Sequence, residues 1–337
     1  MPVVPTGSAG ASSRKRSAEP GENPPGHERE AKKACWGILT SQGLQERERE
    51  RGQIMCSALH MTVSKWLLFT AEGSWADRSP LHEAASQGRL LALRTLLSQG
   101  YPANIVTIDH VTPLHEACLS GHVACVRALI NAGANVNATT IDGVTPLFNG
   151  CAAGSSVCVE LLLQHGANPW TTHAHHPSAL HEACKRGSRE CVESLLSRGV
   201  DPDYEVPHLG SALYMSCLHN HSGCSQVLLH RGADVNRGRG EETPLHAAVA
   251  SDNEEQISLL LDFGADVNLR DCNNLRPVEI APPGGKAQQL LQAHNVSPRS
   301  LCELCRINIR NLIGRSRLKF LQQLPLPSLL TQYLEYT

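Results

Sequence analysis

The sequence predicts an all-α fold, in which a solenoid of stacked helical pairs is followed by a small module of three helices. Three observations support this prediction: an internal repeat of 33 residues, a composition poor in aromatic residues, and a change of pattern near residue 295. Hydrophobic residues make up 41% of the 337 residues and aromatic residues only 4%. Thin layers of Leu, Ala, Val and Cys side chains need few large rings, so the composition favours stacked helices over a sandwich or barrel.

Residues 1–70 are predicted to form a disordered or poorly ordered tail. They lack hydrophobic periodicity and contain a run in which Glu and Arg alternate, a composition that buries too little apolar surface to fold alone. The tail carries two basic clusters, Arg14-Lys15-Arg16 and Lys32-Lys33. These clusters indicate either a two-part nuclear import signal or solvated charge, and we favour solvated charge because short basic runs are weak motifs.

Two sequence markers recur in phase from residue 79 onward. The first marker is a capping residue followed by an apolar turn, at Ser79-Pro80-Leu81-His82, Thr112-Pro113-Leu114-His115, Thr145-Pro146-Leu147-Phe148, Ser178-Ala179-Leu180-His181, Ser211-Ala212-Leu213-Tyr214 and Thr243-Pro244-Leu245-His246. The second marker is a glycine after a Leu-rich stretch, at Gly100, Gly133, Gly166, Gly199, Gly232 and Gly264. The two markers recur with the same spacing, which predicts six repeat units.

The residues of one unit explain why it forms two helices. Thr112 can cap a helix whose first position is Pro113, where the missing N–H has no helical partner to lose. Gly121 allows a tight turn into a second helix over residues 122–131, and Gly133 ends that helix in a left-handed conformation. One unit cannot bury its apolar faces alone, so the units must stack.

A seventh, degenerate unit begins at Arg276-Pro277. The sequence Pro282-Pro283-Gly284-Gly285 interrupts it, so its second helix is expected to start near Lys286. The repeat domain is therefore predicted to span residues 75–294. Its period and its Thr-Pro-Leu-His motif resemble the ankyrin repeat.

Most of the thirteen cysteines follow the same period. Eight of them form four pairs at one phase: Cys118/Cys125, Cys151/Cys158, Cys184/Cys191 and Cys217/Cys224. Because they recur with the fold, we interpret them as small buried hydrophobes and not as metal or redox sites. With no signal peptide visible, free thiols predict an intracellular, reducing compartment, most simply the cytoplasm, with the nucleus as the alternative.

Residues 295–337 leave the repeat and are predicted to form the helical module. One face of an amphipathic helix carries Leu301, Leu304, Cys305, Leu312 and either Ile309 or Ile313. With Ser300 before Leu301, the stretch resembles the elongin-C-binding segment of a SOCS box. That resemblance makes Leu301 the side chain that enters a pocket on elongin C, with Cys305 packed one turn later.

A proline-containing segment follows in the same module. It reads Leu324-Pro325-Leu326-Pro327, with Leu330 on the helix behind it, and the two prolines hold the loop extended. This segment resembles the cullin-5-selective part of a SOCS box, and the resemblance makes these five residues the cullin contact. The alternative is that the C-terminal stretch holds only the last core helix of a domain. That alternative alone would not predict the Leu-Pro-Leu-Pro element.

Together, the repeats and the module resemble the ankyrin-repeat and SOCS-box family over residues 75–337. The stretch Gly73-Ser74-Trp75-Ala76-Asp77-Arg78 is similar to the subgroup that includes members five, nine and eleven. The resemblance implies a non-catalytic substrate receptor that joins a target protein to elongin C, elongin B, and cullin-5 with its RING-box partner. The alternative is an ankyrin scaffold or inhibitor that recruits no ligase.

Target contacts are expected where the repeats depart from their consensus, because the scaffold does not require those residues. The candidates lie in three hairpin regions: Tyr101, Ile108 and His110, then Trp170, His173, His175 and His176, then Tyr204, Glu205 and His208. Exposed Trp and Tyr side chains are common anchors of protein interfaces.

Other classes of function find little support in the sequence. Cys302-x-x-Cys305 has no second pair at zinc-finger spacing, and the cluster around His175 lacks a further ligand. No nucleophile and base stand outside the repeat pattern, so we expect no enzyme, metal or cofactor. The net charge of −2 argues against nucleic acid, and the apolar run Trp66-Leu67-Leu68-Phe69 is too short to span a membrane.

Overall fold

The computed structural model describes residues 77–170, 176–296, 299–318 and 320–336. The predicted tail, both basic clusters, and His173 and His175 lie outside the described residues. The repeat domain was predicted to begin at residue 75, so its first two predicted positions also lie outside the described residues.

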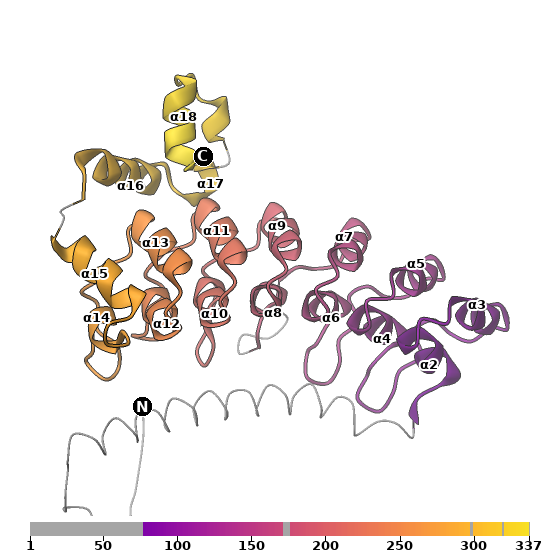
Figure 1. Cartoon of the computed structure of the whole chain (residues 1–337). Helices are drawn as coiled ribbons and strands as arrows, with labels where there is room; N and C mark the ends of the chain where they lie inside the picture. The colour runs from indigo at the N-terminus through magenta and orange to yellow at the C-terminus, as the bar shows by residue number, and fades with distance from the viewer. Residues whose placement is uncertain (1–76, 171–175, 297–298, 319, 337) are drawn as a thin grey trace, which may run out of the picture. The chain divides into compact units, whose positions relative to one another are not determined.

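Within the described residues, six full helical pairs build the solenoid, and each starts at a predicted repeat motif (Figure 1). The pairs are α2 (Pro80–Ser86) with α3 (Leu90–Ser98), α4 (Pro113–Leu119) with α5 (Val123–Asn131), α6 (Pro146–Ala152) with α7 (Ser156–Gln164), α8 (Ala179–Arg186) with α9 (Arg189–Ser197), α10 (Ala212–Leu218) with α11 (Ser222–His230), and α12 (Pro244–Ala250) with α13 (Glu254–Asp262). The first helices form one row and the second helices another. The predicted solenoid of stacked pairs is confirmed.

A capping histidine links each of four units to the next. In the second unit, His115 Nδ1 accepts a hydrogen bond from the main-chain N–H of Thr112 at 3.2 Å, and Nε2 donates to Val144 O at 3.1 Å. Burial lowers the pKa of His115 to about 4, so the ring is neutral near pH 7. The equivalent inter-unit bonds run from His82 to Val111, from His181 to Gly210 and from His246 to Leu275. These histidines therefore have a structural role, because each joins its own unit to the next.

The predicted glycine turns are also present. Gly121 has φ of 71° and Gly133 has φ of 85°, both in the left-handed region that favours glycine. The fourth hairpin departs from the purely helical prediction, because β1 (Glu205–Val206) pairs with β2 (Gly210–Ser211) in an antiparallel ribbon.

The solenoid core is one continuous cluster of Leu, Ala, Val and Cys side chains. All eight repeat cysteines are buried free thiols. Burial raises the pKa of Cys217 to about 12 and that of Cys224 to about 11, so both thiols stay protonated. The prediction that these cysteines act as packing residues is confirmed.

The seventh unit is shortened as the sequence predicts. Its first helix, α14 (Pro277–Ile280), has only four residues and ends before Pro282-Pro283. Its second helix, α15 (Lys286–Val296), begins at the expected residue.

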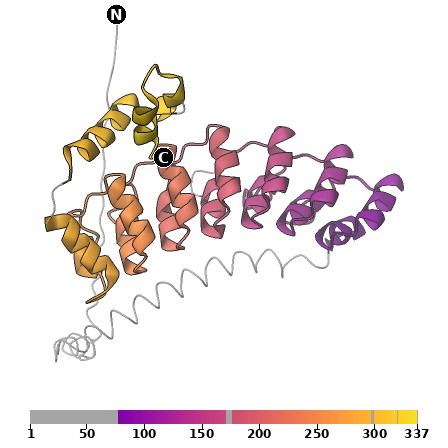
Figure 2. The same cartoon turned by 45° about the horizontal axis from the view of Figure 1, so that its top comes forward.

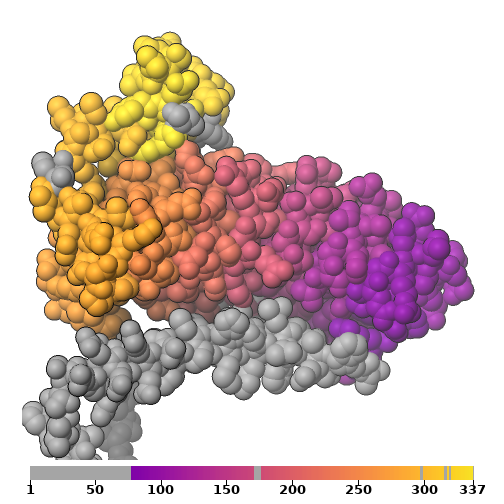
Figure 3. All heavy atoms as spheres, viewed as in Figure 1, coloured from indigo at the N-terminus to yellow at the C-terminus, as the bar shows by residue number. Residues whose placement is uncertain are grey.

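The C-terminal module consists of α16 (Leu301–Ile313), α17 (Arg315–Leu318), the short 3-10 helix η2 (Leu321–Gln323) and α18 (Ser328–Glu335). Its own small core has three buried side chains, Leu318, Leu321 and Leu334. The module lies over the second helices α11 and α13 (Figures 1 and 2). In Figure 3 its yellow atoms lie above the orange part of the solenoid. The hairpin loops extend from the opposite edge of the solenoid.

Candidate functional site

Helix α16 is capped at both ends by local sequence. Ser300 Oγ accepts a hydrogen bond from Glu303 N at 3.2 Å, and Glu303 Oε2 accepts one from Ser300 N at 2.9 Å. This capping box satisfies two main-chain donors at the helix start. Gly314 then ends the helix with φ of 76°.

The outer face of α16 carries the predicted elongin-contacting side chains. Leu301 is 76% exposed, Leu304 48% and Ile309 38%, and Cys305 is exposed on the same face. Leu312, which the same periodicity places on this face, is 75% exposed. The structure therefore brings the predicted residues together as an apolar stripe open to solvent.

The inner face of the same helix mixes charged residues with isoleucines. Arg310 is only 7% exposed, and Glu303, Arg306 and Ile307 are half-buried. A surface helix of a globular protein usually buries its apolar stripe and exposes its charges, whereas α16 exposes Leu301 and Leu312 and buries Arg310. An exposed apolar stripe is typical of a surface that binds a partner.

Arg310 was not among the residues predicted from the sequence. Its guanidinium donates to Leu334 O at 2.7 Å, Leu229 O at 3.1 Å and His230 O at 3.3 Å. Burial lowers the pKa of Arg310, although a guanidinium stays charged in proteins. The available signal was Arg306 and Arg310, four residues apart on the side of the helix away from Leu301.

The predicted cullin-contacting segment is mostly exposed. Leu324 is 43% exposed and Leu330 40%, and both prolines between and beside them are exposed. Leu326 differs, because it packs against the small core of the module. Leu326 N donates to Leu324 O at 2.7 Å, which makes a tight turn centred on Pro325.

Five of the predicted target-contacting side chains are exposed. Ile108 is 71% exposed and Trp170 57%, and Tyr101, His110 and His208 are also exposed. His110 has φ of 60°, which places it at the turn of the first hairpin.

Three other candidates are half-buried. The ring of Tyr204 meets the ring of His181 edge-on at 6.0 Å between centroids. Glu205 forms an ion pair with Arg237 at 3.3 Å across the neighbouring hairpin. His176 is half-buried at the start of the fourth unit.

Two further exposed apolar residues on the hairpins were not predicted. Val106 is 51% exposed and Ile141 60%. Ile141 N donates to Asp109 O at 3.1 Å, so the first two hairpins are joined at their tips. The sequence signal was the repeated Thr-Ile-Asp at Thr107 and Thr140, which puts Ile108 and Ile141 at the same position of successive units.

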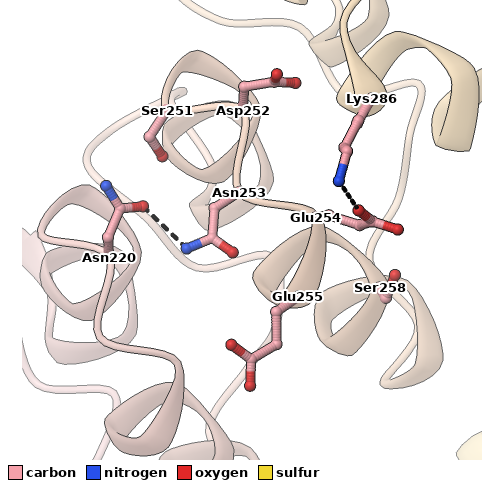
Figure 4. A pocket seen from close by; sticks show the side chains of 8 residues that line it. All are labelled: Asn220, Ser251, Asp252, Asn253, Glu254, Glu255, Ser258 and Lys286. Carbon is pink, nitrogen blue, oxygen red and sulfur yellow. Dashed lines mark hydrogen bonds and ion pairs between the residues drawn. The ribbon is translucent and has the colours of Figure 1, made fainter.

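A polar hollow lies where the sixth unit meets its neighbours (Figure 4). Its groups already serve the scaffold: Asn253 Oδ1 caps α13 by accepting from Gln256 N at 3.1 Å, and Asp252 Oδ1 accepts from Ala287 N at 2.9 Å. Lys286 Nζ pairs with Glu254 at 2.9 Å. The hollow therefore has the character of a repeat junction.

Two other kinds of feature are absent from the described residues. Among them, no group of three or more His, Cys, Asp or Glu side chains is placed to hold a metal ion. No helix within those residues is both long and apolar enough to cross a membrane.

Two family models match the chain. The model for ankyrin repeats in three copies matches residues 54–140, 81–173, 132–206 and 180–271. The model for the SOCS box matches residues 297–335.

Curated relatives match most of the chain. Ankyrin repeat and SOCS box protein 5 of Mus musculus is 56% identical over 265 residues, covering 79% of this chain and 80% of the relative. Ankyrin repeat and SOCS box protein 11 of Homo sapiens is 47% identical over 262 residues, covering 78% and 80%. A crystal structure of the ankyrin repeat domain of human ASB11 aligns with a TM-score of 0.63 and 48% identity, covering 66% of this chain and all of that domain.

Proposed function

Because this chain belongs to the ankyrin repeat and SOCS box protein family, we propose that it is the substrate-recognition subunit of an elongin B/C–cullin-5 RING ubiquitin ligase. The ankyrin repeats bind a target protein, and the SOCS box binds the ligase. Target ubiquitination then leads to proteasomal degradation. In this proposal the chain is not an enzyme, and it acts by raising the effective concentration of the target near the conjugating enzyme.

The exposed apolar stripe of α16 is the observation that carries this proposal. The stripe includes Leu301 and Leu312, both more than 70% exposed, whereas Arg310 on the opposite face bonds to the end of α11. Such an exposed stripe is stabilised by covering it with a second protein. Elongin C is the partner that the family implies for this stripe.

Each residue of the stripe has a distinct part in the proposed contact. Leu301 lies in the first turn and is 76% exposed, and in this proposal it fills a pocket on elongin C. Cys305 lies one turn later, and Leu304 and Ile309 flank it on the same face. The exposed Leu324, Pro325, Pro327 and Leu330 form the proposed cullin-5 contact, with Leu326 turned inward to hold the loop.

On the solenoid, the exposed hairpin residues are the proposed target contacts. Ile108 and Trp170 combine a large apolar side chain with high exposure, which is the character of interface anchors. Val106 and Ile141 join them in our proposal. Tyr204 and Glu205 contribute less, because each already has a partner within the repeats.

The rival is an ankyrin scaffold that recruits no ligase. It would share the same solenoid and would give the outer stripe of α16 another partner or none. The free buried thiols of the repeats support an intracellular location under either reading.

Titration calorimetry of the whole chain with purified elongin B/C tests the proposal. The double variant Leu301→Ala, Cys305→Ala should bind at least about 30-fold more weakly, since removing two anchors from an interface costs about 2 kcal/mol or more. Leu91→Ala is the matched control, because Leu91 is 80% exposed on α3, far along the chain from the module. Its affinity should equal that of the wild type.

Two outcomes would contradict the proposal. If the wild-type chain binds no elongin B/C at micromolar concentration, the scaffold reading takes its place. If the double variant binds as tightly as wild type, the contact lies elsewhere than on α16.

A further inference from the structure

Arg310 connects three helices from two parts of the chain. Its carbonyl acceptors belong to α11 in the fifth repeat unit and to α18 at the end of the module, while Arg310 itself lies on α16. Leu229 is 81 residues away in the sequence. One side chain therefore ties the SOCS box both to itself and to the solenoid.

The acceptors explain how a buried cation is tolerated there. Leu229 and His230 are the last two residues of α11, and Leu334 lies in the last turn of α18. The C-terminal ends of helices carry unpaired carbonyl groups and partial negative charge. The planar fork of an arginine can reach two such helix ends at once, which a lysine ammonium cannot do.

A stack of side chains surrounds this contact. The ring of Tyr336 lies on the ring of Phe263 at 3.8 Å between centroids and 15° between planes. The guanidinium of Arg306 covers the other side of Tyr336 at 3.8 Å. The Tyr336 hydroxyl donates to Asp262 O at 3.0 Å, and Arg310 lies 5.2 Å from the Tyr336 ring. The stack thus fixes the module on the end of α13 as well.

The aliphatic cores of the two parts are not joined. The buried core of the module and that of the solenoid are separate clusters, and the module core has three buried side chains among the described residues. Ile307 on α16 approaches Gly264, where an added Cβ would lie 3.1 Å from the Ile307 side chain. The junction therefore depends largely on the contacts of Arg310 and Tyr336 with the ends of α11 and α13, together with the bond from Arg299 to Ala265 O at 2.8 Å.

We infer that Arg310, supported by Arg306, Tyr336 and Phe263, is a positioning residue that holds the elongin-facing stripe at a fixed orientation to the solenoid. It acts from the inner face of the helix whose outer face is the proposed docking stripe. The consequence for ubiquitin transfer rests on the proposed function: a fixed orientation presents the target at one distance from the conjugating enzyme. The fixed orientation itself is a property of the chain without any bound partner.

Hydrogen exchange of the whole chain tests this inference without any partner. Arg310→Met should speed exchange in residues 301–313 and 328–336 by about tenfold or more, because the module is released from its support. Exchange in α5 and α7 should stay at the wild-type rate. In Arg310→Lys, the exchange rate of the module should lie between those of wild type and Arg310→Met, since an ammonium keeps the charge but reaches one helix end at a time. Arg127→Met, an exposed arginine on α5, is the matched control.

Small-angle scattering on complexes with elongin B/C separates positioning from mere stability. The released variant should still bind elongin B/C within about threefold of wild type, because the outer stripe is intact, and its distance distribution should broaden. Tyr336→Phe removes only the hydroxyl bond to Asp262. It should speed exchange in the module and broaden the distance distribution, each by less than Arg310→Met does. If Arg310→Met fails to fold, Arg310→Lys and Tyr336→Phe give the same comparison.

Wild-type exchange in the module of Arg310→Met would overturn the inference. An equal rise in α5 and α7 would also overturn it, because Arg310 would then support the whole fold and not the junction. If the wild-type chain does not bind elongin B/C, the proposed function fails while the exchange result still decides the role of Arg310.

Discussion

Helices α9 and α16 are built from the same kinds of residue but face opposite ways. Helix α9 buries Cys191, Val192 and Leu195 among its neighbours and leaves its charges exposed. Helix α16 exposes Leu301 and buries Arg310. The difference teaches that an amphipathic helix alone does not say which face the rest of the chain covers. In α9 the apolar face packs within the repeats, whereas in α16 it remains open to solvent.

Acid should lower the folding stability of the solenoid through its buried histidines. Burial lowers the pKa of both His115 and His181 to about 4, against an ordinary value of 6.5. Between these values the unfolded chain binds protons that the folded chain does not, so stability is complete above about pH 6.5 and falls as the pH drops toward 4. The expected loss is about 3 kcal/mol for each histidine. Denaturant unfolding across this range measures it.

The variant His115→Asn isolates the histidine contribution. The buried carboxyls of Glu116 and Glu182 have a raised pKa because of burial and so act in the opposite direction. The difference between variant and wild type cancels their effect. The share of the loss that belongs to His115, about 3 kcal/mol, should vanish in the variant, and an unchanged pH profile would show that protonation of His115 is not linked to folding.

A pair of leucine truncations sharpens the comparison directly. Leu162→Ala removes a fully buried side chain from α7 and should lower the free energy of unfolding by about 3 kcal/mol. Leu312→Ala removes a side chain that is 75% exposed on α16 and should change it by less than about 0.5 kcal/mol. Urea unfolding of the free chain measures both. Comparable losses would mean that the stripe on α16 is covered in solution.

The solenoid and the C-terminal module also differ in how much the sequence could predict. Within the repeats, Thr112 marks a cap and Lys286 the start of a helix, because capping and turn chemistry act over a few residues. The contact of Arg310 with Leu229 spans 81 residues, and no local pattern records it. The inward turn of Leu326 likewise depends on a core that only the folded module creates.

The same capping motif in both regions gives the finest test. Thr112 caps α4 and is 3% exposed, with its hydroxyl 2.8 Å from His115 Nδ1, whereas Ser300 caps α16 in the open. Thr112→Ala should destabilise the whole chain by about 1 to 2 kcal/mol, since the buried ring loses a partner. Ser300→Ala should cost only about 0.5 to 1 kcal/mol.

The location of the loss matters more than its size here. For Ser300→Ala, hydrogen exchange should rise in the first turn of α16 and leave α4 unchanged, because an exposed cap can be replaced by water. Ser300→Asp keeps an oxygen acceptor at the cap and should restore the wild-type rate. If instead Ser300→Ala loosened the repeats, the start of α16 would be part of the solenoid's cooperative unit, and the two helices compared above would differ in polarity only.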